Sequence, residues 1–204
     1  MALIGSYYLS KVKQYYQAGN SAREIAEKLN VPLDAVYYFF RKYKIPRRSA
    51  RENNELLFKK KAPSFKLKVN LSPNEELLKT AGVMLYWAEG SKWAGEVIVD
   101  FANSDPAMIR IFLAFLRKIC GVNKNKLGCY LYCYDNQNPR QLLKFWSAVT
   151  RIPQARFSKP YIRKDSRKNK IGKMKYGLLH LRYYDKKLLL QLRQWINDFS
   201  KHYQ

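Results

Sequence analysis

The chain has 204 residues, and its 39 lysines and arginines outweigh 15 aspartates and glutamates to give a formal net charge of +24. This cationic excess favours a polyanionic partner, while a hydrophobic content of 47% excludes a disordered basic tail. No stretch approaches the roughly 18 apolar residues of a membrane span, and the N-terminus lacks the apolar run of a signal peptide. We therefore expect a soluble intracellular protein of two domains without a membrane partner, cytoplasmic and nucleoid-associated in a prokaryote or phage.

The cysteines and histidines exclude several kinds of site. Cys120, Cys129 and Cys133 are an odd and sparse set without paired C-x-x-C spacing, which disfavours a disulfide framework and a zinc site. No nucleophile stands at a recognisable spacing from the two histidines, and no glycine-rich phosphate loop is present. We expect the three cysteines to be buried thiols.

The N-terminal part of the chain predicts three short helices. Apolar spacing places them at about 7–17, 21–30 and 33–43, and Ser21 with Glu24 forms a capping-box signature for the second. The string AGNSAREIAEKLNVPLDAVYYFFRKYKIP resembles the helix-turn-helix of resolvase-like and transcription-regulator proteins. A three-helix unit could alternatively serve only as a packing or dimerisation module.

The helix-turn-helix resemblance implies that the third helix enters the major groove of DNA and that a basic arm follows along phosphates or a minor groove. The candidate DNA-contacting residues are Tyr37, Tyr38, Arg41 and Lys42 on the helix, with Asp34 also outward, and Arg47 and Arg48 on the arm.

A basic linker is expected over residues 47–71. This stretch has two short basic clusters, one proline and no sustained apolar period, which favours a flexible strap lying along DNA. Its charge could instead aid solubility alone, above all at the run 59–61. The predicted organisation is a helix-turn-helix domain over 1–46, this linker, and a second domain over 72–204.

The second domain begins with a well-marked helix. Ser72 and Glu75 form a capping box, and the helix runs to Glu89. Residues 81–88 are apolar nearly all round, so we expect burial on more than one side. The Glu89 carboxylate opposes the helix macrodipole, which suggests a functional role as a metal ligand.

The string AGVMLYWAEGS resembles the helix motif of the LAGLIDADG homing endonuclease family, with Glu89 and Gly90 standing where that motif ends in an acid and a glycine. Downstream patterns predict strands at 96–103, 126–135, 157–164 and 176–184, and helices from about 105 to 120, 139 to 150 and 185 to 201. The expected fold class is α+β: a three-helix helix-turn-helix, then a LAGLIDADG-like αββαβαββα domain with an antiparallel DNA-binding sheet.

Alternation along the predicted strands separates an apolar face from a basic, aromatic one. Cys129, Leu131 and Cys133 share one face, and Tyr130, Tyr132 and Tyr134 the other. On the last two strands the candidate DNA-contacting residues are Lys159, Tyr161, Arg163, His180 and Arg182, opposite Leu179, Leu181 and Tyr183. A sheet of this kind suits a DNA saddle, which is how the family uses its sheet.

The single motif copy implies, by the family's logic, a homodimer that recognises a roughly palindromic site. Glu89 of each subunit would then bind Mg²⁺ near the scissile phosphate, with Lys159 or Lys175 as unassigned candidates for a supporting lysine. Glu89 could instead be a structural carboxylate paired with Lys92 or Arg182. Asp100 and Asp105 could suggest a different metal pair, but a helix cap for Asp105 and an exposed strand position for Asp100 fit better.

The sequence therefore predicts sequence-specific binding of double-stranded DNA, with metal-dependent endonuclease activity of the LAGLIDADG homing type. A non-cleaving DNA-binding transcriptional regulator built on the same domain is the alternative. An RNA-binding protein is less favoured, although the 16 tyrosines could stack on unpaired bases.

Overall fold

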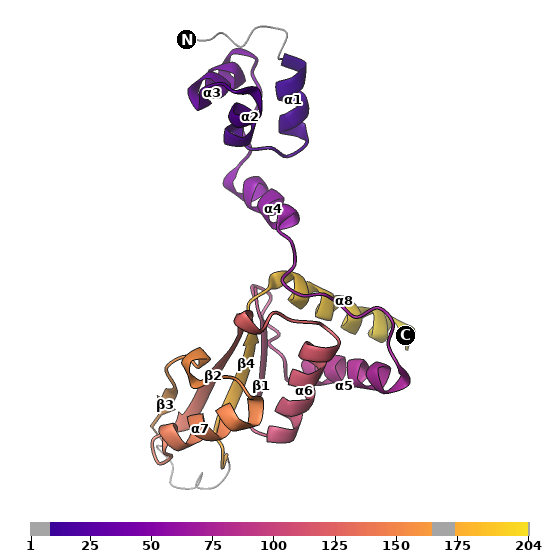
Figure 1. Cartoon of the computed structure of the whole chain (residues 1–204), viewed down its shortest axis with the longest axis vertical. Helices are drawn as coiled ribbons and strands as arrows, with labels where there is room; N and C mark the ends of the chain where they lie inside the picture. Colours follow the sequence, from indigo (N-terminus) through magenta and orange to yellow (C-terminus); the bar gives the residue numbers. More distant parts are fainter. Residues whose placement is uncertain (1–8, 165–173, 204) are drawn as a thin grey trace. The chain divides into compact units, whose positions relative to one another are not determined.

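The structure is a computed structural model that describes residues 9–164 and 174–203. The chain divides into two compact units, Met1–Ala62 and Pro63–Gln204. The fold is of mixed α+β class, with all of the strands in the second unit (Figure 1). No helix within the described residues has the length and apolar character needed to cross a bilayer.

The first unit contains the helices α1 (Leu9–Gln17), α2 (Ala22–Leu29), α3 (Leu33–Lys42) and α4 (Ala50–Lys60). The three predicted helices are thus present, although the predicted start of the first one lies outside the described residues. The Ser21–Glu24 capping box is confirmed, and α2 ends at Asn30 in the left-handed conformation. Val12, Ile25 and Val36 are buried where α1, α2 and α3 meet.

Helix α4 contradicts the expectation of a flexible linker over 47–71. Ser49 and Glu52 form a capping box that starts the helix. Past its end, Ser64 is hydrogen-bonded to Asp185 and to Tyr183, and so belongs to the second unit. The predicted linker is therefore ordered over most of its length.

The second unit contains the helices α5 (Pro73–Glu89), α6 (Pro106–Lys118), α7 (Pro139–Thr150) and α8 (Lys186–His202), and the strands β1 (Val99–Asn103), β2 (Leu127–Tyr134), β3 (Tyr161–Arg163) and β4 (Leu178–Tyr183). The described order is αβαβαββα. It has one strand fewer than the predicted order αββαβαββα, in which two strands follow the first helix of this domain. Where the additional strand is expected after α5, Gly90 forms only an isolated bridge with Phe101. The third strand is shorter than predicted because Pro160, which cannot donate to a ladder, separates it from the single bridge of Phe157 to Cys129.

The sheet has the strand order β1-β4-β2-β3. Strand β4 is antiparallel to both β1 and β2, but β3 is parallel to β2, so the expectation of an antiparallel sheet is wrong at this edge. The physical reason is the helix α7 between β2 and β3, because a helical crossover returns the chain in the same direction.

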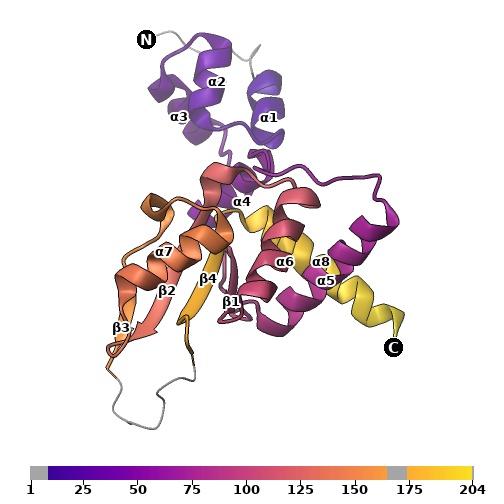
Figure 2. The ribbon, with the colours of Figure 1, turned by 60° about the horizontal axis from the view of Figure 1, so that its bottom comes forward.

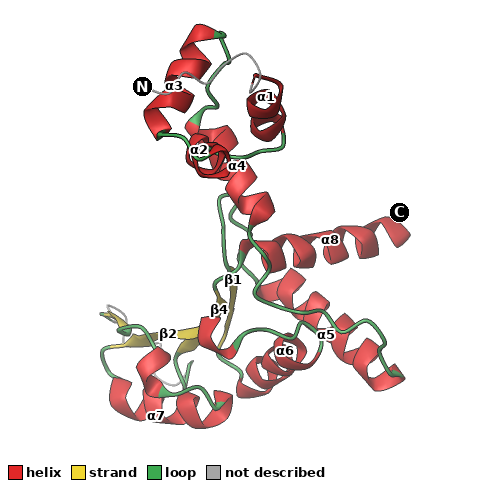
Figure 3. Ribbon diagram, turned by 45° about the horizontal axis from the view of Figure 1, so that its top comes forward, coloured by secondary structure: helices red, strands yellow, loops and turns green. Residues whose placement is uncertain are grey.

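One face of the sheet packs against helices. Phe101, Leu131 and Leu181 are fully buried in a core shared with the helices of this unit. Helices α6 and α7 lie on the same side of the sheet (Figures 2 and 3). The predicted apolar face formed by Cys129, Leu131 and Cys133 is confirmed as this buried face.

Helix α5 is buried along one side only, which corrects the expectation of burial on more than one side. Gly82, Val83 and Tyr86 are buried, whereas Leu77 is 70% exposed and Trp87 is 40% exposed. Gly82 permits the close approach of α6, because a Cβ atom there would lie 2.1 Å from Cγ of Phe115.

Candidate nucleic-acid interface

The face of the sheet that points away from the helical core carries tyrosines and cations from β2, β3 and β4, together with Asp100 from β1. Strand register places Asp100 beside Arg182, Tyr130 beside His180, and Tyr134 beside Arg163. We call this set of neighbouring residues the outer face. Its members alternate with the buried residues of the same strands, as the period of two in a strand requires.

Asp100 organises the part of the outer face formed by β1 and β4. Its carboxylate lies 2.9 Å from Nδ1 of His180 and accepts from Nε of Arg182 at 2.8 Å. The Asp100 side chain is only 12% exposed, so the expectation of an exposed strand residue is wrong. Burial alone would raise the pKa of Asp100, but the hydrogen bonds and charges of His180 and Arg182 outweigh burial and lower it.

Aromatic rings extend the outer face across the sheet. The guanidinium of Arg182 lies 4.7 Å from the ring centroid of Tyr130. On the far side, the rings of Tyr132 and Tyr161 stack at 5.0 Å. Arg163 approaches the Tyr132 hydroxyl at 3.4 Å, and this contact raises the pKa of the arginine. The face therefore combines fixed cations with flat apolar rings.

The structure brings together four of the five predicted sheet residues: Tyr161, Arg163, His180 and Arg182. Lys159 is exposed just before β3, outside the ladder. Asp100 and Tyr130 were not among the predicted site residues. These two residues could be assigned to the site only from the register between strands that lie some 80 positions apart in the sequence. The alternation within one strand does not reveal that register.

Glu89 is the last residue of α5 and is exposed. The bridge of Gly90 to Phe101 holds this helix end against β1. Neither structural ion pair considered for Glu89 is formed, because Lys92 donates to the Trp87 carbonyl and Arg182 is bound to Asp100.

The described residues contain no group of three or more histidine, cysteine, aspartate or glutamate side chains that could hold a metal ion. Glu89 thus offers a single carboxylate. Asp105 caps α6 by accepting from the Ala107 backbone N–H at 2.6 Å, as expected. A metal site of several protein ligands within the described part of one chain is therefore not supported.

In the first unit, α3 presents Tyr38, Arg41 and Lys42 at the surface. Tyr37 is half-buried, and the guanidinium of Arg47 lies 4.4 Å from its ring centroid. The exposed cations of α3 are free of the core, as a contact to phosphates or base edges requires.

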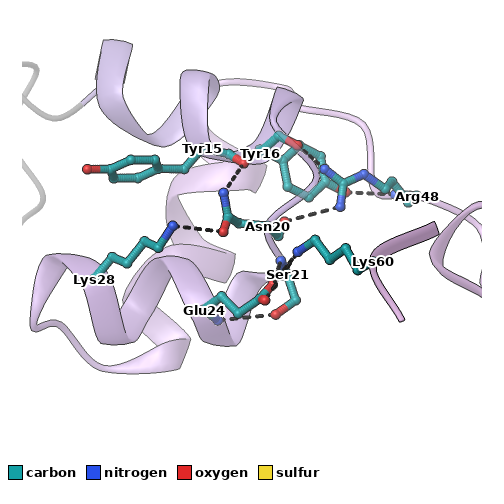
Figure 4. A network of polar contacts seen from close by, with 8 residues as sticks. All are labelled: Tyr15, Tyr16, Asn20, Ser21, Glu24, Lys28, Arg48 and Lys60. Carbon is teal, nitrogen blue, oxygen red and sulfur yellow. Dashed lines mark hydrogen bonds and ion pairs between the residues drawn. The ribbon is translucent and has the colours of Figure 1, made fainter. Parts of the chain in front are cut away.

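Arg48 serves the structure of the first unit rather than extending as an arm. Its guanidinium donates to the backbone carbonyls of Tyr16 and Asn20 and lies 3.9 Å from the Tyr16 ring centroid (Figure 4). The same network includes the pair of Lys60 and Glu24 at 3.2 Å, which connects α4 to α2. Arg48 and Lys60 therefore hold α4 against the three-helix core, a role that the sequence did not indicate.

Searches of protein-family models, of curated proteins and of solved structures find no match to this chain. Its function is therefore inferred from its own residues and their geometry.

Proposed function

We propose that the protein binds double-stranded DNA in a sequence-specific manner through the outer face of its sheet. The observation that carries the proposal is the array of Arg182 and His180, both held by Asp100, with the exposed Arg163 beside the stacked tyrosine pair on the same face of the sheet. The net charge of +24 supplies the long-range attraction for a polyanion. A β-sheet surface is one of the elements that proteins place in a DNA groove.

The first unit contributes a second contact in this proposal. Two helices, α1 and α2, the second followed by a left-handed residue at Asn30, precede α3 with its exposed Arg41, Lys42 and Tyr38. Helix α3 is then the helix that lies in the major groove. Two contact regions on one chain would lengthen the recognised site and steepen the response to salt.

The test is equilibrium binding of labelled duplex DNA at several salt concentrations. Each neutralised phosphate adds about 0.9 to the slope of log affinity against log salt, so several contacts give a steep fall. Replacement of Arg163 by alanine should weaken binding and lower that slope. Lys144→Ala is the matched control, because Lys144 is an exposed cation on α7, on the side of the sheet opposite to the outer face.

A nearly flat salt response of the unaltered protein would refute the proposal. Equal losses from Lys144→Ala and from Arg163→Ala would exclude the outer face as the binding surface. Tighter binding of folded RNA than of duplex DNA at matched salt would favour an RNA partner instead.

DNA cleavage is a second candidate function, favoured by the exposed carboxylate of Glu89 at a helix end held against the sheet. Mg²⁺ is commonly bound by one or two carboxylates together with substrate phosphates, so a single glutamate per chain fits only a site that DNA completes. Bound there, the ion would supply a more acidic water and neutralise charge on phosphate oxygens. Glu89 is the residue of this chain that would hold it.

A homodimer accompanies this second candidate. The exposed Leu77 and Trp87 lie on one side of α5, and a hollow there is lined by Met84, Trp87 and Ala88. A second copy of α5 would cover this apolar stripe and bring two Glu89 residues to one DNA site. Sedimentation of the unaltered protein and of Trp87→Glu tests the pairing, and a monomer in both cases would refute it.

Cleavage is tested with a duplex library in Mg²⁺ or Mn²⁺, comparing the unaltered protein with Glu89→Gln at equal bound fractions. Discrete cuts that disappear with Glu89→Gln would establish an endonuclease. Tight specific binding without cuts from either protein would establish the non-cleaving regulator. Cuts that persist in Glu89→Gln would exclude Glu89 as the essential acid.

A further inference from the structure

Arg182 is held in place by its inner nitrogen. Nε donates to Oδ2 of Asp100 at 2.8 Å, and the flat guanidinium lies over the ring of Tyr130. The side chain is only 26% exposed, and β4 stands between β1 and β2 in the sheet. An arginine fixed in this way has lost most of its rotamer freedom before any ligand arrives.

The contact through Nε leaves the outer edge of the guanidinium unused by this carboxylate. The two terminal amino groups, Nη1 and Nη2, form a planar fork that matches two acceptors side by side. The cross-strand neighbour of Arg182 on β2 is Gly128, which has no side chain of its own and is covered by the ring of Tyr184, 3.3 Å from where a Cβ atom would lie. The fork thus stands on a central strand of the sheet, near the C-terminal end of that strand, with its inner edge already satisfied.

The charge of the cluster selects between two possible ligands of the fork. Asp100 neutralises Arg182, and its negative charge would repel a phosphate brought to the same place. The O6 and N7 atoms of guanine are neutral acceptors in the bidentate geometry that the fork fits. Arg163 differs, because its contact uses Nη1 and a tyrosine hydroxyl, and no carboxylate of the described residues binds its inner nitrogen.

We infer that Arg182 recognises a guanine in the major groove of the bound duplex and that Asp100 is the positioning residue that aims it. The inference rests on the proposed binding of duplex DNA and adds the base and the residue that determine specificity. Asp100 touches no base itself; it acts by fixing the direction of the guanidinium.

The test is selection of binding sites from a randomised duplex library by the full-length protein, followed by affinity measurement on the selected site and on random duplex. Arg182→Lys keeps the charge and removes the fork. Because a bidentate contact discriminates by about 1–3 kcal/mol, this variant should lose roughly 5- to 150-fold in preference for one guanine position, measured as the ratio of its affinities for the selected site and for the same site with that guanine replaced. Arg163→Lys, the matched control, should keep that guanine preference.

Asp100→Ala tests the positioning role and should relax the same guanine position without changing the other selected positions. Asp100→Asn retains an oxygen that can accept from Nε and should recover part of the preference. If an Asp100 variant fails to fold, as judged by circular dichroism, the Arg182→Lys result decides the inference alone, because that variant leaves the carboxylate in place.

Three outcomes overturn the inference. One is an Arg182→Lys protein that weakens on all sequences alike, which would make Arg182 a phosphate contact. The second is an unchanged guanine preference in Asp100→Ala. The third is duplex binding by the unaltered protein without any guanine position that depends on Arg182. An unaltered protein that does not bind duplex DNA would instead refute the proposed function itself.

Discussion

Replacement of Gly82 by alanine should destabilise the second unit, although alanine is the better helix former. Its Cβ would lie 2.1 Å from Cγ of Phe115, whereas carbon atoms in contact lie about 3.5–4.0 Å apart. The Phe115 ring must therefore move by more than about 1 Å. It is fully buried, with ring centroids 5.8 Å from Phe112 and 6.2 Å from Trp195, so the shift disturbs a filled core.

The balance of two effects sets the magnitude. Alanine gains about 1 kcal/mol in helix propensity over glycine, and overpacking a core typically costs about 1–3 kcal/mol or more. Since the overlap involves the centre of a buried ring, we expect a cost at the upper end of that range, about 3 kcal/mol, and therefore a net loss of about 2 kcal/mol in the free energy of unfolding.

Urea unfolding followed by tryptophan fluorescence measures this loss, because Trp87, Trp93, Trp146 and Trp195 are the chain's four tryptophans and all lie in the second unit. The double variant Gly82→Ala with Phe115→Leu should lose less than the sum of the single changes, because leucine gives the new methyl group room. An unchanged or higher urea midpoint for Gly82→Ala would refute the close packing of α5 on α6.

Two further predictions concern the first unit and acid pH. Arg48→Lys should lower the amide-exchange protection of α1 and α2, because lysine lacks the two terminal nitrogens with which Arg48 reaches the two carbonyls separately. The expected loss is about 1–3 kcal/mol, against no loss in Arg47→Lys. Equal protection in both variants would contradict the role of Arg48. The backbone N–H of Ser21 and the ammonium of Lys60 lower the pKa of Glu24 from 4.5 to about 2. A carboxyl with a lowered folded-state pKa stabilises above its unfolded value, so this contribution is present above about pH 4.5 and is lost as the pH falls toward 2. Glu24→Gln should therefore reduce the acid dependence of α2 protection, and an unaltered dependence would refute the assignment.

Most elements of the fold could be predicted because their signals are local. The helix starts at Ser21 and Ser72 follow from capping boxes, and the alternation in 126–135 fits β2. The same S-x-x-E signature stands at Ser49, but the charge of the surrounding segment favoured a linker over a helix. Helix α4 has no buried residue, so the apolar period that marks other helices is absent there.

The incorrect predictions concern strands that pair although they lie far apart in the sequence. The parallel pairing of β3 depends on the path of the chain through α7, and that helix between two strands was an available indication of a crossover. At the candidate site, alternation correctly grouped His180 with Arg182 on one face. Their common partner, Asp100, depends on a register between distant strands that composition and period do not encode.

The reactivity of the buried cysteines reports on how often the second unit opens. Burial raises the pKa of Cys120 and of Cys129 to about 12, and it raises the pKa of Cys133 as well. Since the thiolate is the nucleophile, alkylating reagents should be slow on the closed core and fast once it opens. All three thiols lie beyond residue 62. The rate at which iodoacetamide adds mass to the protein would therefore report on the opening of the second unit, with no contribution from the first.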